Sequence, residues 1–261
     1  MYRPKKSLGQ NFLIDKNIIK KILILVKIEN SNVIEIGSGK GALTNEILKK
    51  KPKSLSIIEK DDSLINELTL KFSNVKNVKI YKADILKFKI EKIQKENSII
   101  MGNLPYNISS QILIKFLKQK KWPPKFKDLV FMFQKELGNK IINTYPSPDY
   151  GRLSIIANYR LNVVKKFLVS PNSFYPKPKV TSMVIHFQPK KNNSIKIKNT
   201  NNLEKITNIL FSNKRKMINK NIIKILNKDM INKILGNRIY LRPAEIKPEI
   251  FYKIAKYYED S

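Results

Sequence analysis

Short apolar runs alternate with amphipathic stretches over the first half of the chain. A short apolar run between turn-forming residues is typical of a buried strand, and apolar residues three or four positions apart are typical of a helix. Alternating strands and helices predict a parallel sheet covered on both faces, which is an α/β fold. We predict strands at 32–36, 55–58, 78–81, 99–101 and 129–133, and helices at 18–26, 42–50, 63–72, 109–117 and 135–142.

The pattern changes after residue 150. One helix, 153–159, precedes two strands, 163–169 and 180–187, that are joined by a proline-rich loop. Late strands of this kind indicate an antiparallel pair at the edge of the sheet. A linker rich in Asn and Lys follows, and beyond it only helical patterns occur, at 203–211, 217–226, 230–235 and 249–257. We therefore predict two domains, residues 1–190 and a helical domain of residues 191–261.

The composition of the 261 residues favours a polyanionic partner, because the formal net charge is +32. A positive field of this size attracts nucleic acid or an anionic membrane. Lysines outnumber arginines by 46 to 6, a bias that AT-rich coding also produces, so the sign of the charge is more informative than its size. With no cysteine and one histidine, disulfides and thiolate metal sites are excluded, and we predict no metal.

The N-terminus predicts a soluble protein. Residues 1–6 are basic, but polar residues 7–11 stand where a signal peptide has its apolar stretch. The longest aliphatic run, 22–26, is much shorter than the ~20 residues that cross a bilayer. We predict a cytoplasmic protein with no membrane partner, and we expect a monomer because nothing in the sequence demands a dimer.

A glycine-rich turn, residues 37–41, follows the first of these strands and opens a helix. Glycines let the backbone approach a ligand, and a helix N-terminus favours a carboxylate or a phosphate. The spacing also satisfies the dinucleotide-binding fingerprint. A tight turn without a ligand has the same pattern, so this motif alone leaves the function open.

Two carboxylates, Glu59 and Asp84, stand where the next two strands end. Glu59 is placed to accept from both hydroxyls of a ribose, which fits NAD and S-adenosylmethionine equally. Asp84 is placed to accept from an adenine amine, with the backbone of Ile85 beside the ring. Because the carboxyl ends of parallel strands share one crevice, we predict a nucleoside cofactor there. An NAD-dependent oxidoreductase also needs a proton donor, and the only histidine, His186, is late in the chain.

The 103–106 segment, Asn-Leu-Pro-Tyr, follows an apolar run that stops at a glycine. Pro105 has no backbone donor and favours an extended conformation at Leu104. The segment therefore presents an amide oxygen, a main-chain carbonyl and a flat ring to a small planar ligand. This matches the needs of methyl transfer to an amino group. The alternative is a simple strand-to-helix turn capped by Ser109.

Residues 35–41 together with 102–109 resemble the motifs of the rRNA adenine N6-methyltransferases. Within this family the chain is most similar to the small-subunit rRNA adenine dimethyltransferases of ribosome maturation. The large-subunit enzymes of macrolide resistance are the alternative, and the glycine turn looks more like theirs. Leu104 and the run Lys214 to Lys216 favour the maturation enzymes. The similarity runs nearly end to end, also through 9–13, 150–154, 174–180 and 211–216.

The resemblance implies a Rossmann-like methyltransferase fold, with a parallel sheet and an antiparallel edge, plus a small all-α C-terminal domain that binds RNA. It implies S-adenosyl-L-methionine as cofactor, held by Asn11, Leu13, Gly37, Gly39, Glu59, Asp84, Ile85 and Asn103. The implied catalytic residues are Asn103, Leu104, Pro105, Tyr106 and Phe174, the two rings stacking on an extruded base. The residues implied to contact RNA phosphates are Arg3, Lys5, Lys6, Lys214, Arg215 and Lys216.

The implied activity is dimethylation of two adjacent adenines near the 3′ end of small-subunit rRNA, in a pre-ribosomal small subunit. A second class is a binding factor that keeps the fold for assembly or transcription and has lost catalysis. The presence of Glu59, Asp84 and Asn103 argues against that loss.

Overall fold

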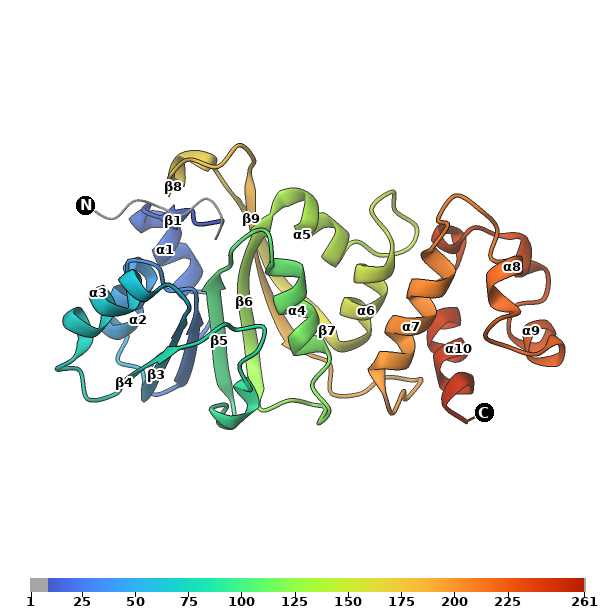
Figure 1. The fold of residues 1–261 in the computed structure, drawn as a ribbon, viewed down its shortest axis with the longest axis horizontal. Coiled ribbons are helices and arrows are strands. Elements are labelled where there is room, and N and C mark those ends of the chain that lie inside the picture. Colours follow the sequence, from blue (N-terminus) through green and yellow to red (C-terminus); the bar gives the residue numbers. More distant parts are fainter. Residues whose placement is uncertain (1–8, 261) are drawn as a thin grey trace. The chain divides into compact units, whose positions relative to one another are not determined.

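The structure is a computed structural model that describes residues 9–260. Its main sheet has seven strands in the order β4-β3-β2-β5-β6-β9-β7 (Figure 1). β2 to β6 pair in parallel and β9 pairs antiparallel with β6, so the predicted α/β sheet with an antiparallel edge is confirmed. The strands are β2 (Asn32–Ile36), β3 (Ser54–Glu59), β4 (Val78–Lys82), β5 (Ser98–Asn103), β6 (Phe126–Gln134), β7 (Leu161–Val169) and β9 (Ser182–Pro189).

Helices cover both faces of this sheet. Three of them, α1 (Lys16–Leu23), α2 (Ala42–Lys49) and α3 (Asp62–Phe72), lie on one side, and α4 (Ser109–Leu117) lies on the other (Figure 1). The strands supply alternate apolar side chains to the core below α1–α3, because successive side chains of a strand point to opposite faces. This core includes Val33, Leu55, Ile57, Ile99, Met101, Val130 and Met132.

The strand order reverses between β2 and β5. The chain runs outward from β2 to β3 and β4, and then returns to place β5 on the other side of β2. The two backbones approach closely at the end of the pair, because a Cβ atom on Gly102 would lie 2.5 Å from the main-chain oxygen of Ile36. In open α/β sheets, ligands bind in the crevice at such a reversal point.

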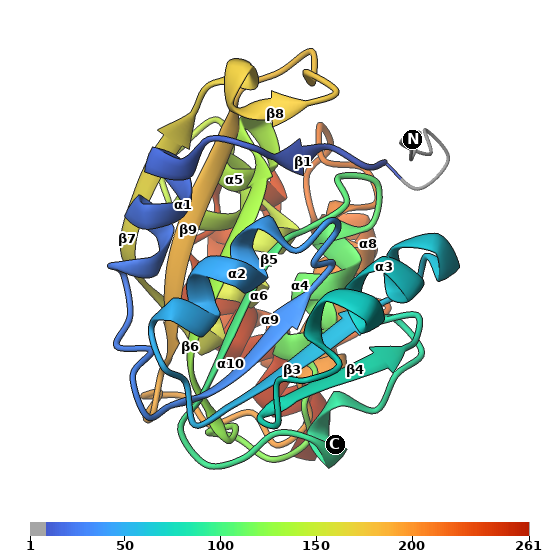
Figure 2. The same ribbon diagram turned by 90° about the vertical axis from the view of Figure 1, so that its left-hand side faces the viewer.

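A second, two-stranded sheet joins the N-terminal arm to a late segment. β1 (Phe12–Leu13) pairs antiparallel with β8 (Phe174–Tyr175), through Phe12 with Tyr175 and Leu13 with Phe174 (Figure 2). The sequence predicted only a polar arm and a proline-rich loop here. Two-residue strands carry no hydrophobic period, so the pairing has no signal in the sequence.

The described chain divides into two compact units. The first contains residues up to 115 together with 123–138 and 162–189, and the second contains residues 116–122, 139–161 and 190 onward. The division at residue 190 predicted from the sequence stays a prediction, because packing alone does not identify the segments that fold as one domain. The remaining elements are α5 (Lys135–Ile142), α6 (Arg152–Arg160), α7 (Thr200–Phe211), α8 (Asn219–Ile222), α9 (Lys228–Ile234), α10 (Pro248–Asp260) and the 3₁₀ turns Ile90–Lys92, Pro171–Ser173, Gly236–Tyr240 and Pro243–Glu245.

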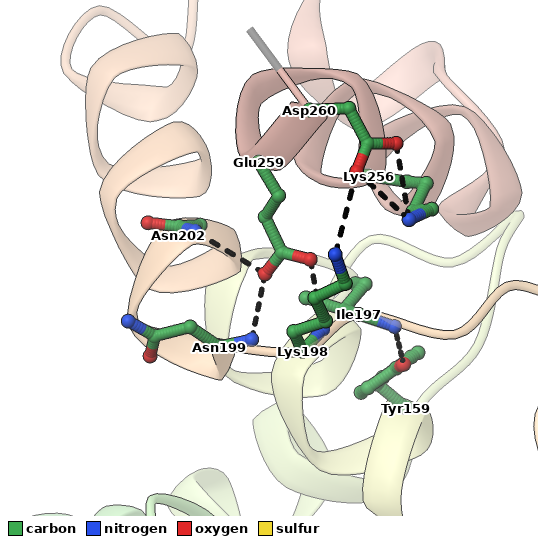
Figure 3. Close-up of polar contacts among 8 residues, drawn as sticks. All are labelled: Tyr159, Ile197, Lys198, Asn199, Asn202, Lys256, Glu259 and Asp260. Atoms are coloured by element: carbon green, nitrogen blue, oxygen red, sulfur yellow. Dashed lines mark hydrogen bonds and ion pairs between the residues drawn. The ribbon is translucent and has the colours of Figure 1, made fainter.

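In the second unit, α10 packs against α7, and the rings of Phe251 and Phe211 stack with centroids 5.7 Å apart. The carboxylate of Glu259 accepts from the main-chain nitrogens of Lys198 and Asn199, at 2.8 and 2.6 Å, just before α7 begins (Figure 3). It also accepts from the Asn202 amide at 3.2 Å. The end of α10 thus holds the start of α7.

The helix predicted at 217–226 is wrong in extent, since α8 spans only Asn219–Ile222. Three apolar residues of this stretch, Ile218, Ile222 and Leu226, are buried. However, Asn227 caps the next helix, α9, by accepting from the Met230 nitrogen. Between Ile222 and Asn227 the chain forms a turn, in which the nitrogen of Ile225 donates to the oxygen of Ile222 at 2.9 Å.

Candidate active site

A cavity of about 290 Å³ lies at the carboxyl ends of β2, β3, β4 and β5. This is the end at which the strand order reverses between β2 and β5, where a ligand is expected. Glu59, Asp84 and Asn103 all line the cavity, so the prediction that they meet in one crevice agrees with the structure. The wall comprises residues 9–14, 35–40, 42, 43, 58–60, 64, 83–85 and 103–108.

The glycine turn is covered closely by the N-terminal arm. Gly37 and Gly39 both adopt left-handed backbone conformations, with φ of +69° and +55°. A Cβ atom on Gly39 would lie 2.7 Å from the ring of Phe12 in β1, closer than two carbon atoms can pack. Glycine at position 39 therefore lets the arm lie directly on the turn, and the arm forms one wall of the cavity.

Glu59 presents a carboxylate that the main chain holds in place. One oxygen accepts from the nitrogen of Gly39 at 3.2 Å, and the other from those of Lys60 and Asp61 at 2.8 and 3.0 Å. Burial raises the pKa of Glu59, and these three N–H groups partly offset the rise. The oxygens are fixed at the cavity wall, where they can accept from ligand hydroxyls.

Asp84 lies at the end of β4 and forms an ion pair with Lys60, at 2.8 Å. Its second oxygen accepts from the main-chain nitrogen of Leu86 at 2.9 Å. The hydrogen bond from Lys60 lowers the pKa of Asp84, although partial burial opposes this. Asp84 therefore stays a carboxylate near neutral pH and can accept from a ligand amine.

Asn103 ends β5, and its side-chain nitrogen donates to the main-chain oxygen of Asn11 at 2.7 Å. With the amide nitrogen turned to the arm, Oδ1 is the atom available to accept from a ligand. Leu104, Pro105 and Tyr106 follow along the cavity wall. The 103–106 segment thus offers an acceptor oxygen and a partly buried ring beside the two carboxylates.

Residues 1–260 match the family model described as ribosomal RNA adenine dimethylase. The chain belongs to the ribosomal RNA adenine dimethylase family. The resemblance found in the motifs is therefore confirmed, and the chain is an rRNA adenine methyltransferase. A relative from Pelagibacter ubique (strain HTCC1062), named ribosomal RNA small subunit methyltransferase A, is 44% identical over 260 residues, which is 99% of this chain and 98% of the relative.

Solved structures share the fold of this dimethylase. A dimethyladenosine transferase from Plasmodium falciparum superposes with a TM-score of 0.79 at 25% identity, covering 95% of this chain and 98% of that one. The 23S rRNA methyltransferase ErmE superposes with a TM-score of 0.65 at 22% identity, covering 94% and 99%. The predicted Rossmann-like methyltransferase fold is confirmed.

The dimethylase cavity also contains a carboxylate that the sequence did not identify. Glu35 lies on β2, is 1% exposed, and accepts from the hydroxyl of Thr44 at 2.7 Å. Burial raises its pKa to about 7, and the charge of Glu59 adds to the rise. The sequence does contain a signal for this residue: Glu35 is the one acidic residue within the apolar run Val33–Ile36. A charged residue in a buried strand is costly and therefore points to a special role.

Not every predicted site residue reaches the cavity. Asn11, Leu13 and Ile85 line it, whereas Phe174 does not. Phe174 is 3% exposed and lies in the core, where it pairs from β8 with Leu13 of β1. Because a base can stack only on an accessible face, Phe174 does not offer a ring to the cavity in this structure.

Three of the six predicted RNA-binding residues lie in the part of the chain that the structure describes. Lys214, Arg215 and Lys216 are exposed and follow α7 after Ser212 and Asn213. Arg3, Lys5 and Lys6 lie outside the described residues.

Between residues 9 and 260, no three acidic or histidine side chains lie close enough to hold a metal ion. Over the same residues, every helix is too short or too polar to span a membrane.

Proposed function

We propose that this dimethylase transfers methyl groups from S-adenosyl-L-methionine to the amines of two adjacent adenines near the 3′ end of small-subunit rRNA, forming N6,N6-dimethyladenosine. It acts in the cytoplasm, as a monomer, on a small subunit still in assembly. One observation carries the proposal: the 103–106 segment borders the same cavity as Glu59 and Asp84. A methyl donor and an acceptor amine can therefore meet there.

The cavity residues fit an adenosine-containing cofactor. The fixed carboxylate of Glu59 suits the two hydroxyls of a ribose, and that of Asp84 suits the amine of an adenine beside Ile85. The glycine turn lets the backbone approach the methionine portion at Gly37 and Gly39. Asn11 and Leu13 of the arm would cover the cofactor from the other side.

The 103–106 segment would prepare the acceptor nitrogen. In a free adenine the lone pair of the amine is delocalised into the ring, so the nitrogen is a weak nucleophile. Hydrogen bonds from its two protons to Asn103 Oδ1 and the Leu104 carbonyl favour a pyramidal nitrogen with an available lone pair. Pro105 restricts the backbone and so keeps the Leu104 carbonyl in one direction.

When bound, the cofactor supplies a methyl group on a positively charged sulfur. The chain's own contribution is to hold the amine nitrogen ~3–3.5 Å from that carbon, and such positioning supplies much of the rate. The methylated amine then loses its proton to water, so the mechanism needs no strong base. The monomethylated amine keeps one proton, so for the second methyl group it donates a single hydrogen bond, to Asn103 Oδ1 or to the Leu104 carbonyl.

The rRNA would be held outside the cavity. A target adenine must leave its stack to reach the 103–106 segment, and the ring of Tyr106 offers it a new stacking partner. The exposed Lys214, Arg215 and Lys216 would bind phosphates in a salt-dependent way. The name of the Pelagibacter relative supports a small-subunit substrate over a large-subunit one.

The proposal is tested with small ribosomal subunits purified from cells that lack this methylation. The protein and methyl-labelled cofactor are added, and the labelled bases are mapped by primer extension. We expect label on two adjacent adenines near the 3′ end, with two methyl groups on each. Subunits that already carry the modification serve as the control and should take up none.

Two results would contradict the proposal. No label on the small subunits, together with label on large-subunit rRNA assayed in parallel, would assign the chain to the large-subunit enzymes instead. Tight binding to small subunits with no methyl transfer, in a protein that binds the cofactor, would make it an assembly factor.

A further inference from the structure

Ser182 reaches the 103–106 segment from a strand far along the chain. Its hydroxyl lies 2.6 Å from the hydroxyl of Tyr106, within hydrogen-bond distance. Ser182 is the first residue of β9 and is 0% exposed. A buried hydroxyl needs a partner, so the contact satisfies a polar group of each residue.

The position of Ser182 is determined by the main chain. Ser182 pairs with Gln134 in the antiparallel ladder between β9 and β6. Next to it, the nitrogen of Lys135 donates to the main-chain oxygen of Thr181 at 2.9 Å. These contacts hold Ser182 whether or not Tyr106 is present, so Ser182 is a fixed point for the ring.

Tyr106 has no such ladder, because it lies on the turn between β5 and α4. Its main-chain oxygen accepts from the Ser109 hydroxyl at 3.1 Å, which holds one end of the residue. The bond to Ser182 holds the other end. A half-buried ring fixed only at its backbone can change rotamer, whereas a ring fixed at both ends keeps its plane.

We propose that Ser182 is a positioning residue for methyl transfer: its hydrogen bond sets the plane of the Tyr106 ring on which the target adenine stacks. The inference rests on the proposed function and adds to it a residue from β9. Burial raises the pKa of Tyr106, so its hydroxyl keeps a proton to donate near neutral pH. Ser182 itself touches neither cofactor nor RNA in this account.

The test uses Ser182→Ala, Tyr106→Phe and the double variant, assayed on undermethylated small subunits. Each single variant removes one side of the same bond, so each should lower kcat about tenfold, as expected when reacting groups lose alignment. The double variant should be no slower than either single one. The dissociation constant for S-adenosylmethionine should change less than about twofold, because neither hydroxyl is needed to hold the cofactor.

Ser98→Ala is a matched control. Ser98 is also 0% exposed and begins a strand, β5, but its hydroxyl bonds to the main chain of Lys95 at 2.6 Å. This variant should lose stability and keep kcat. Ser182→Thr retains the hydroxyl and should recover more activity than Ser182→Ala, which a purely space-filling role does not predict.

The coupling is also measured without activity, from urea unfolding of the same variants. Effects on unfolding that are smaller in combination than in sum would show that the bond forms in solution. Independent effects, or a normal kcat in Ser182→Ala, would overturn the inference while the proposed function stands. A wild-type protein that binds cofactor but leaves small-subunit rRNA unmethylated would overturn both.

Discussion

The side-chain amide of Asn103 donates a hydrogen bond to the main-chain oxygen of Asn11, across 2.7 Å. A carbonyl oxygen only accepts, so the amide nitrogen must face the arm and Oδ1 must face away from it. The arm that lines the cavity therefore also orients the proposed acceptor of the adenine amine. In the proposed mechanism, this one bond between residues far apart in the chain links the cover over the cofactor to the acceptor for the base.

We predict that Gly39→Ala weakens binding of S-adenosylmethionine about tenfold. The new methyl group would stand 2.7 Å from the Phe12 ring, so β1 must move away from the cavity. The left-handed backbone at this position adds about 1 kcal/mol of instability for a residue with a side chain. Isothermal titration calorimetry measures the affinity.

Gly236→Ala is the control for this prediction. Gly236 has a similar φ of +51°, but its Cβ would meet no atom within 4 Å. It should cost a similar backbone strain and leave the cofactor affinity unchanged. Equal losses of affinity in the two variants would show that strain, and not contact with the arm, is responsible.

Glu35 should make the protein less stable as the pH rises from about 4.5 to 7. Its pKa is about 7 when folded and 4.5 in the reference state, because it is buried. The folded protein thus keeps a proton that the unfolded chain has lost, so stability falls between about pH 4.5 and 7 and then levels off. Glu35→Gln should be more stable than the wild type at pH 8 by up to about 3 kcal/mol.

Urea unfolding from pH 5 to pH 8 measures this difference. Glutamine keeps an oxygen for the Thr44 hydroxyl, so the variant isolates the charge. Burial also raises the pKa of Glu59, which is present in both proteins. Parallel pH profiles for the two proteins would show that Glu35 does not titrate in this range.

Asp84→Asn should reduce the affinity for S-adenosylmethionine about tenfold, since a charged acceptor gives way to a neutral amide. The affinity of the wild type should show no titration of Asp84 near neutral pH, because Lys60 lowers its pKa. Asp62→Asn is the matched control. Asp62 pairs with Lys82 at 2.8 Å on the surface, both side chains being 66% exposed, and its loss should leave the affinity unchanged.

Glu259→Gln should destabilise the second unit by about 1–2 kcal/mol, because one of its oxygens becomes a donor facing the nitrogens before α7. Cofactor affinity should not change. Asp260→Asn, which removes exposed ion pairs to Lys256 and Lys198, should cost less than half as much. Thermal unfolding measures the stability of both variants. Equal losses of stability would show that the contacts of Glu259 to the start of α7 (Figure 3) are not stronger than the exposed ion pairs of Asp260.

The sequence sufficed to predict that Glu59, Asp84 and Asn103 lie in one cavity. Each follows a recognisable apolar run, and the geometry of a parallel sheet brings the ends of such runs together. The resemblance to the family motifs then assigned these residues to binding of S-adenosylmethionine and of the target adenine. The roles of these residues remain predictions that the variants above test.

The parts that the sequence did not predict depend on contacts between distant segments. The pairing of β1 with β8 buries Phe174, although its motif suggested an open ring. The contact of Ser182 with Tyr106 depends on the register of β9, which no local pattern determines. Glu35 was not predicted as a site residue, because the run 33–36 was interpreted only as a buried apolar strand.

The central claim is that Asn103 accepts from the adenine amine, and Asn103→Ala tests it most directly. The variant and the wild type are compared for single-turnover methylation of undermethylated small subunits and for cofactor affinity. Losing this acceptor should slow methylation by at least about a hundredfold, as for other groups that act in the transition state. The loss of rate should far exceed any change in cofactor affinity. Methylation at the wild-type rate with unchanged cofactor affinity would contradict the account.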